Sequence, residues 1–185
     1  MKFEELSKNF ELNKEILSQL DLNTIEEIAL KIDEVRNNNN VIYVAGNGGS
    51  SSTASHFVND LVKATINSNK NRIKAISLTD NIPLLTAVSN DISYSEAFSF
   101  TLESFAAEGD MMIAISASGN SKNLINAVDY CKDNNIYTAG LLGFNGGILN
   151  EKVDLSNLTK TPIGQYELVE NMHMIICHLI TFYLK

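Results

Sequence analysis

The feature that most constrains this chain is the stretch 40–61, where a short apolar run passes through glycines and serines into a helical pattern. Residues 41–45 are apolar and mostly β-branched, which predicts a strand buried on both faces. Residues 46–50 form a tight polar loop, and the helical pattern starts at Ser51. Such a loop can hold a phosphate, because glycines allow close approach and free N–H groups at the helix start point at the anion. The alternative is an ordinary glycine-rich turn without a ligand.

Four more apolar runs alternate with helical patterns along the chain, at 73–78, 111–115, 137–142 and 153–155. Strands that alternate with helices predict an α/β fold, here a three-layer αβα sandwich around a five-stranded, parallel, doubly wound sheet. Ligands of such sheets bind beyond the carboxyl ends of the strands. A second serine-rich loop, 116–121, follows the third strand. We therefore expect the two loops to share one anion at one edge of the sheet.

Helical patterns fill most of the remaining chain. Two helices precede the first strand, at 3–20 and 25–35, and a long helix closes the chain at 167–184. The others start at Ser51, at 81–83 with a break at 89–91, at 95 and at 122. Asn23 or Thr24 can cap the second helix, and Phe98, Phe100 and Phe105 are expected in the core. No strand precedes the first two helices, so we expect residues 1–38 to pack outside the sheet or against another subunit.

The composition excludes several function classes. With 14 basic and 22 acidic residues the formal net charge is −8, which argues against a broad nucleic-acid-binding face. The N-terminal residues do not resemble a signal peptide, and no apolar stretch is long enough to span a bilayer. Cys131 and Cys177 are the only cysteines and have no metal-binding spacing, so we expect a reducing cytoplasm. The length predicts one domain over residues 1–185.

Three histidines and their acidic neighbours are candidates for chemistry. His56 and Asp60 differ by about 40° around a helix, and Glu170 and His178 by about 80°. His173 lies about 140° from His178, and we interpret it as structural. The last helix is apolar nearly all round, so Glu170 and His178 need partners that offset desolvation. Hydrogen bonds from His56 and Asp60 are one solution, and a zinc ion held by two imidazoles and two carboxylates is the other.

Four motifs follow one another along the chain: GNGGSSSTASHFVNDL from Gly46, SND from Ser89, ISASGNS from Ile115 and VENMHMIICHLI from Val169. In this order they resemble the phosphoheptose isomerases, which belong to the sugar isomerase (SIS) domain family and convert sedoheptulose 7-phosphate to a heptose 7-phosphate. The resemblance extends from about residue 1 to residue 185. It implies the SIS fold, a phosphorylated sugar as substrate, and a homotetramer with sites between subunits.

The resemblance also implies a role for each site residue. The residues expected to bind the substrate are Asn47, Gly48, Gly49, Ser50 and Glu170, and those expected to contact the sugar are Asn90 and Asp91. The residues expected to bind the phosphate are Ser116, Ala117, Ser118 and Ser121. Metal binding or proton transfer falls to His56, Asp60, Glu170 and His178, with one zinc ion per subunit and no organic cofactor.

The chain departs from the family pattern at the centre of this site. The family usually has Glu where this chain has Asp60, Gln where it has Glu170, and Thr where it has Ala117. A Gly-Arg pair expected at Lys63-Ala64 is absent. One interpretation is that the catalytic carboxylate has moved, so that Glu170 acts as base or metal ligand. The other is an altered substrate or a loss of activity.

The expected function is aldose–ketose isomerisation of a phosphorylated sugar through an enediol. This reaction needs a base for a carbon-bound proton, an acid beside the carbonyl oxygen and a remote grip on the phosphate. Asp60 or Glu170 is the expected base, and His178 the expected acid. One alternative is a non-catalytic SIS protein that binds a phosphosugar or a protein partner. Another is an isomerase of a different sugar phosphate, because the sequence does not fix the length of the sugar.

Overall fold

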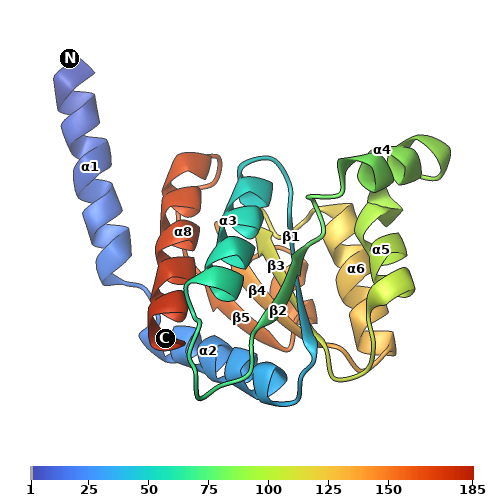
Figure 1. The fold of residues 1–185 in the computed structure, drawn as a ribbon. Helices are drawn as coiled ribbons and strands as arrows, with labels where there is room; N and C mark the ends of the chain where they lie inside the picture. Colours follow the sequence, from blue (N-terminus) through green and yellow to red (C-terminus); the bar gives the residue numbers. More distant parts are fainter. Residues whose placement is uncertain (1) are drawn as a thin grey trace.

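The computed structural model describes residues 2–185, which form five strands and eight α-helices. Figure 1 shows the sheet at the centre, between two layers of helices. The strands are β1 (Val41–Gly46), β2 (Lys74–Ser77), β3 (Met111–Ser116), β4 (Tyr137–Leu142) and β5 (Leu155–Leu158). All neighbouring strands are parallel, in the order β2-β1-β3-β4-β5, so the predicted doubly wound α/β fold is confirmed.

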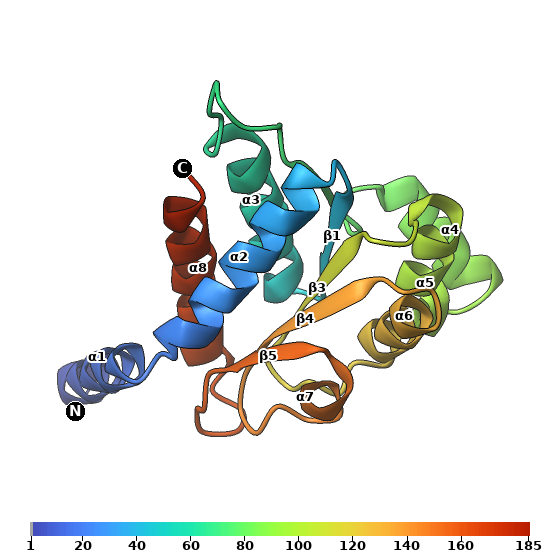
Figure 2. The same cartoon turned by 90° about the horizontal axis from the view of Figure 1, so that it is seen from below.

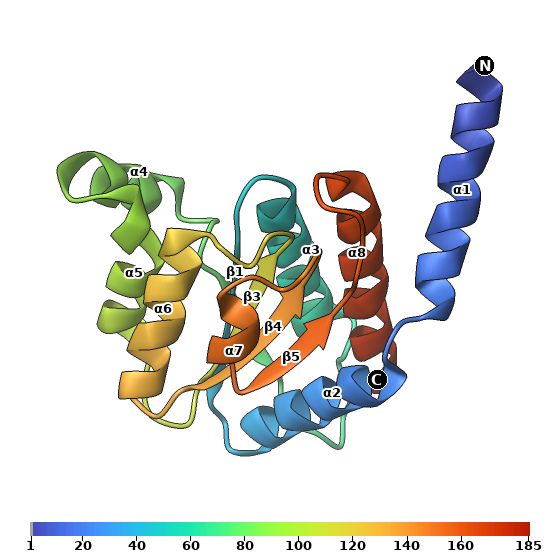
Figure 3. The same ribbon diagram turned by 180° about the vertical axis from the view of Figure 1, so that it is seen from behind.

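Side chains of the central strands alternate between two hydrophobic cores. In β1, Ile42 and Val44 face one core, while Tyr43 and Ala45 face the other. The first core is covered by α2 (Leu22–Asn37), α3 (Gly49–Lys63) and α8 (Tyr166–Tyr183). The second is covered by α5 (Ala97–Phe105), α6 (Lys122–Asp133) and α7 (Leu149–Lys152). Figures 2 and 3 show the two layers from below and from behind. Burial on both faces explains the nearly continuous apolar runs of these strands.

Helix α4 (Ile82–Asp91) starts where the sequence predicts and ends later than predicted. The side chain of Asn81 caps it by accepting the backbone N–H of Leu84, and Pro83 lies in the first turn. The predicted break at 89–91 is wrong, because these residues form the last turn of the helix. A short 3-10 helix, η1 (Tyr94–Glu96), follows and leads into α5.

Three further expectations are corrected. Asp21, not Asn23 or Thr24, caps α2, because its carboxylate accepts the backbone N–H groups of both residues. Phe98 is fully buried as predicted, but Phe100 and Phe105 are exposed. Phe100 lies about 200° around α5 from Phe98, and Phe105 is the last residue of the helix. The fifth strand is Leu155–Leu158 rather than 153–155, because α7 extends to Lys152 and Val153 is its C-cap.

Helix α1 (Lys2–Ser18) stands away from the sheet, beside α8 (Figure 1). Only Ile16 of α1 is buried, and it packs against Leu168 and Met172 of α8. Large apolar side chains along the rest of the helix are exposed: Phe3, Leu6 and Phe10. Of the helices in residues 2–185, none is long and apolar enough to cross a membrane.

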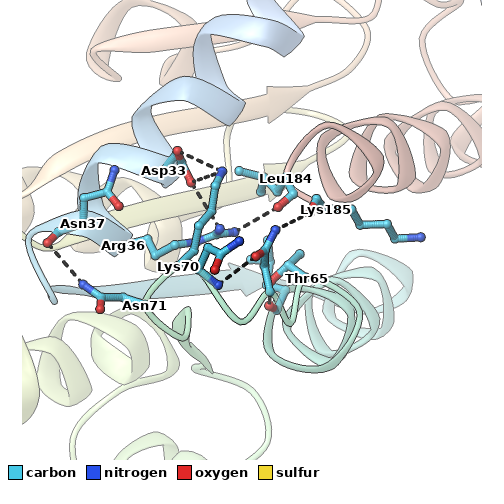
Figure 4. A network of polar contacts seen from close by, with 11 residues as sticks. Asp33, Arg36, Asn37, Thr65, Lys70, Asn71, Leu184 and Lys185 are labelled. Carbon is cyan, nitrogen blue, oxygen red and sulfur yellow. Dashed lines mark hydrogen bonds and ion pairs between the residues drawn. The ribbon is translucent and has the colours of Figure 1, made fainter.

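A buried arginine fixes the C-terminal end of α8 against α2 (Figure 4). The guanidinium of Arg36 is 1% exposed and donates a hydrogen bond of 3.3 Å to the carbonyl of Leu184. It also pairs at 3.2 Å with Asp33, which accepts a second contact from Lys70 on the loop after α3. This network sets the position of α8, the helix that carries Glu170 and His178. Nothing local in the sequence predicts it.

Candidate active site

The two serine-containing loops meet at the carboxyl edge of the sheet. Strands β1 and β3 are neighbours, and Gly46 is opposite Ile115 in the register. The loops that follow them line one pocket, together with the first turns of α8. The residues around this anion pocket are Asn47, Ser50, Ile115, Ser116, Ala117, Ser118, Ser121, Tyr166 and Glu170. The predicted convergence of the loops is therefore present.

The first loop leaves a backbone donor free at the start of α3. Gly48 is the N-cap of α3, with a φ of 54° that favours glycine, and no side chain caps the helix. The N–H groups of Ser50 and Ser51 donate to the carbonyls of Asn47 and Gly48, whereas that of Gly49 has no acceptor within residues 2–185 and is available to an anion. The helix dipole favours negative charge there. Gly49 lies directly against Glu170, because a Cβ atom at this position would collide with the carboxylate of Glu170. Glycine is needed here for close approach rather than for its backbone angles.

The second loop has the same construction. The hydroxyl of Ser116 accepts the N–H of Gly119 at 3.0 Å, which folds the loop back on the strand. Gly119 has a φ of 64°, and a Cβ atom there would collide with the carbonyl oxygen of Gly146. Ser121 is the N-cap of α6, but its side chain makes no capping hydrogen bond. Its hydroxyl is therefore available to a ligand in the pocket that it lines.

Helices α3 and α8 pack side by side on one face of the sheet (Figure 1). Gly49 faces Glu170 near their N-terminal ends, and His56 faces His178 further along, so the two helices run in the same direction. With a rise of 1.5 Å per residue, seven residues of α3 and eight of α8 place the histidines about 10–12 Å from the anion pocket. The site therefore has two separate parts along one pair of helices.

The distal part is a compact group of two imidazoles and one carboxylate. The Nε2 atoms of His56 and His178 are 3.0 Å apart. The Oδ2 atom of Asp60 lies 3.3 Å from Nε2 of His56 and 3.8 Å from Nε2 of His178. Both imidazoles are about half exposed, at 45% and 53%, whereas Asp60 is 19% exposed. The group is thus open to a ligand on one side.

These distances fit a zinc ion. Tetrahedral zinc with bonds of about 2.0–2.1 Å separates its ligand atoms by about 3.3 Å, close to the spacing of the three atoms here. Three protein ligands and one open position are typical of catalytic rather than structural zinc sites. Within residues 2–185, His56, Asp60 and His178 are the group of side chains close enough to share an ion.

Other predicted site residues lie elsewhere. Glu170 lines the anion pocket, two helical turns from His178, so the structure does not gather the four residues into one cluster. Asn90 and Asp91 are exposed at the end of α4, where the amide of Asn90 donates to the carboxylate of Asp91 at 2.7 Å. They do not line the anion pocket.

Three residues near the site have no counterpart in the sequence prediction. Tyr166 lines the anion pocket, and Tyr94 and Asn123 hydrogen-bond to Asn47. A tyrosine at the start of α8 and an asparagine in the first turn of α6 are visible in the sequence. What they touch depends on the fold, so no local pattern identifies them.

His173 lies on α8 between the two parts of the site and is completely buried. Burial lowers the pKa of its imidazole to about 4, and the backbone of Leu142 only partly opposes this shift. A neutral, buried imidazole agrees with a structural role.

This burial predicts a pH dependence of stability. The usual pKa of 6.5 applies to the unfolded chain, so both states hold His173 neutral above pH 6.5 and its contribution is fully present. Between pH 6.5 and 4 the unfolded chain binds a proton that the folded protein does not. The free energy of unfolding then decreases by up to about 1.4 kcal/mol for each unit by which the pH falls. The free energy of unfolding of His173→Leu and of the unsubstituted protein is measured with urea at several pH values. Its decrease between pH 6.5 and 4 should be smaller for the variant. An equal decrease in both proteins would contradict the prediction.

Comparisons with known proteins agree with this fold. A family model described as the SIS domain matches residues 9–143. The chain is 37% identical over 159 residues to the phosphoheptose isomerase of Aneurinibacillus thermoaerophilus, covering 86% of this chain and 79% of that protein. It is 35% identical over 185 residues to a probable phosphoheptose isomerase of Thermoplasma volcanium, covering 98% and 93%. The structure of a phosphoheptose isomerase from Neisseria gonorrhoeae superimposes with a TM-score of 0.91 at 23% identity, covering 100% of this chain and 98% of that one.

Proposed function

The chain belongs to the sugar isomerase (SIS) domain family, among the phosphoheptose isomerases, and from that premise we propose that it converts sedoheptulose 7-phosphate to D-glycero-D-manno-heptose 7-phosphate. One observation carries the proposal: an anion pocket and a His56–Asp60–His178 group lie at successive positions along α3 and α8, which the helical rise separates by about 10–12 Å. A substrate that spans them needs its phosphate and its reacting carbons at opposite ends of a long chain. A 7-phosphate with its carbonyl at C2 meets this requirement better than a shorter sugar.

The phosphate end supplies binding energy. We assign it to the free N–H group of Gly49 and the hydroxyl of Ser50, with Gly48 providing the turn, and to the second loop through Ser116, Ala117, Ser118 and Ser121. Because the net charge is −8, backbone donors and hydroxyls have to do most of this work. Asn90 and Asp91 extend from α4 and are assigned to the hydroxyl groups of the sugar. Binding energy from these remote contacts can be used to orient the reacting carbons.

The reacting end moves protons between two adjacent carbons. A base removes a proton from C1 of the ketose while an acid protonates the carbonyl oxygen at C2, which gives the enediol. Return of a proton to C2 and loss of the proton from the C1 hydroxyl give the aldose. We assign His178 as the acid, through Nδ1 when Nε2 holds the metal. Position favours Asp60 over Glu170 as the base, because Asp60 lies 3.8 Å from His178 whereas Glu170 lines the anion pocket.

We assign His56, Asp60 and His178 as the ligands of one zinc ion per subunit. The spacing of their ligand atoms and the open side of the group support this assignment. Bound zinc would supply Lewis-acid polarisation of the substrate oxygens.

Metal removal gives a direct prediction. Dialysis against a chelator is expected to lower turnover at least 10-fold and zinc to restore it, as measured together with the metal content. Full activity in metal-free protein would contradict the assignment.

The substrate is tested with a panel of ketose phosphates. Sedoheptulose 7-phosphate, fructose 6-phosphate and ribulose 5-phosphate are incubated separately with the protein, and the aldose products are followed by NMR. We expect the highest kcat/KM with the seven-carbon sugar. A higher value with a shorter sugar would assign a different substrate. Tight binding of a phosphosugar without any turnover would favour the alternative of a non-catalytic SIS protein.

We also propose a homotetramer in the cytoplasm, where phosphorylated sugars are made and used. The exposed apolar residues of α1 support an interface between subunits, because Phe3, Leu6 and Phe10 are 82%, 66% and 63% exposed. A groove between α1 and α8 continues this surface through Leu17 and Ile175. Large exposed apolar patches on a soluble protein are typical of interaction sites. Light scattering of the purified protein tests the proposed state.

A further inference from the structure

We infer that Tyr94 and Asn123 are positioning residues that hold the first anion-binding loop in place through the side chain of Asn47. This inference rests on the proposed anion site, and it adds two residues to which neither the sequence nor the comparisons assign a role. We call the three side chains the amide link: Asn47, Tyr94 and Asn123.

The amide link is a connected set of hydrogen bonds. Asn47 and Asn123 bond reciprocally: Nδ2 of Asn123 donates to Oδ1 of Asn47 at 2.9 Å, and Nδ2 of Asn47 donates to Oδ1 of Asn123 at 3.0 Å. The hydroxyl of Tyr94 donates to the same Oδ1 atom of Asn47 at 2.6 Å. The Oδ1 atom of Asn123 also accepts the backbone N–H of Leu124 at 2.9 Å, which ties the set to the first turn of α6.

The link joins three segments that are distant in the sequence. Asn123 lies in the first turn of α6, two residues after Ser121 of the second loop, and is 3% exposed. Tyr94 lies in η1, three residues after Asp91 of the proposed sugar contact. Asn47 lies in the first loop, one residue before the N-cap of α3. All three proposed substrate-binding segments are therefore connected through one amide group.

The hydrogen-bond capacity of Asn47 limits its own role. A carboxamide oxygen has two lone pairs, and Tyr94 and Asn123 occupy both. One of its two N–H donors is also used, which leaves a single N–H for a substrate. The oxygen of Asn47 is thus not available to a sugar hydroxyl. Its main contribution is to fix the first loop, whose residues Asn47 and Ser50 line the anion pocket.

Preorganisation explains why such a link should affect affinity. Free backbone donors bind an anion well only if the loop already holds them in the right geometry, because ordering a loop on binding costs free energy. Asn123 ties the first loop to the start of the helix that follows the second loop, so the two halves of the pocket keep a fixed separation. Loss of the link should weaken phosphate binding without removing any group that touches the phosphate.

The experiment compares Asn123→Ala and Tyr94→Phe with a matched control, Asn126→Ala. Asn126 is also on α6 and bonds to η1 through the carbonyl of Ser95 and the carboxylate of Glu96, but it does not contact Asn47. The affinity of each protein for inorganic phosphate is measured by calorimetry. Zinc content, thermal stability, and kcat and KM for sedoheptulose 7-phosphate are measured in parallel.

We expect the dissociation constant for phosphate to rise about 10-fold or more in Asn123→Ala and about 2- to 10-fold in Tyr94→Phe. KM should rise in parallel, with a smaller change in kcat and unchanged zinc content, while Asn126→Ala should bind phosphate normally. A purely structural role would lower stability but leave phosphate affinity unchanged, and this result would overturn the inference. If Asn123→Ala does not fold, the phosphate affinity of Tyr94→Phe tests the inference. This variant should fold, because it removes one oxygen from a half-exposed side chain. Failure of the unsubstituted protein to bind phosphate would instead refute the proposed anion site.

Discussion

Asp60→Asn is expected to lower kcat for sedoheptulose 7-phosphate about 10²- to 10⁴-fold, the usual loss when a general base is removed. The amide keeps the size of the side chain but cannot accept a proton from carbon. It also removes the negative ligand beside His56 and His178, so zinc content should fall. KM should change much less, because the anion pocket lies about 10–12 Å away along α3 and α8. Steady-state kinetics and metal analysis of the same preparation measure both effects.

Two variants show whether Asp60 or Glu170 is the base. Asp60→Glu keeps the carboxylate one methylene further from the backbone and should retain far more activity than Asp60→Asn. Glu170→Gln should keep most of kcat and lower KM, because Glu170 lines the anion pocket, where its negative charge opposes a bound phosphate. A large loss of kcat in Glu170→Gln, with activity retained in Asp60→Asn, would reverse the assignment. Asp133→Asn, on the exposed end of α6, is the control for the loss of a carboxylate.

The sequence predicts the strands and the two loops well because their signals are local. Strand β4 has the predicted limits, and β3 extends one residue further than predicted. Apolar runs that end in glycine and serine identify both a buried strand and the turn that follows it. The order of strands in a doubly wound sheet then brings the two loops to one edge, since β1 and β3 are neighbours.

The composition of the distal site is harder to predict, because helical angles omit the rise along the helix. Glu170 and His178 are about 80° apart around α8, which suggests one site, but they are also about 12 Å apart along its axis. The parallel packing of α3 and α8 therefore pairs Glu170 with Gly49 and His178 with His56. That packing depends on tertiary contacts, including the buried network of Arg36 at the end of α8.

The amide link shows a second limit of sequence analysis. Asn47 and Asn123 are 76 residues apart, and neither lies in a pattern that indicates the other.

The exposed aromatic residues show a third limit of sequence analysis. Phe100 and Phe105 fit a core helix by composition, but large apolar side chains often remain on protein surfaces. Burial depends on the position of a helix relative to the sheet, which hydrophobicity alone does not give.

His178→Ala is expected to abolish turnover almost completely, with kcat lowered about 10²- to 10⁴-fold. The variant loses the proposed acid and one imidazole of the His56–Asp60–His178 group, so its zinc content should also fall. The two losses can be separated with excess zinc. If His178 only holds the metal, excess zinc should restore most of the activity. If it also transfers a proton, activity should stay low until imidazole is added to the assay.

The other histidine of α8 provides the control for this experiment. His173 is five residues from His178 on the same helix, but it is fully buried and its pKa of about 4 keeps it neutral at pH 7. His173→Leu should therefore keep its zinc content and most of its kcat, even if its stability changes. Loss of turnover and of zinc in His173→Leu, with both retained in His178→Ala, would exchange the roles of the two histidines. It would also remove the distal half of the proposed site, because His56 and Asp60 contact His178 and not His173.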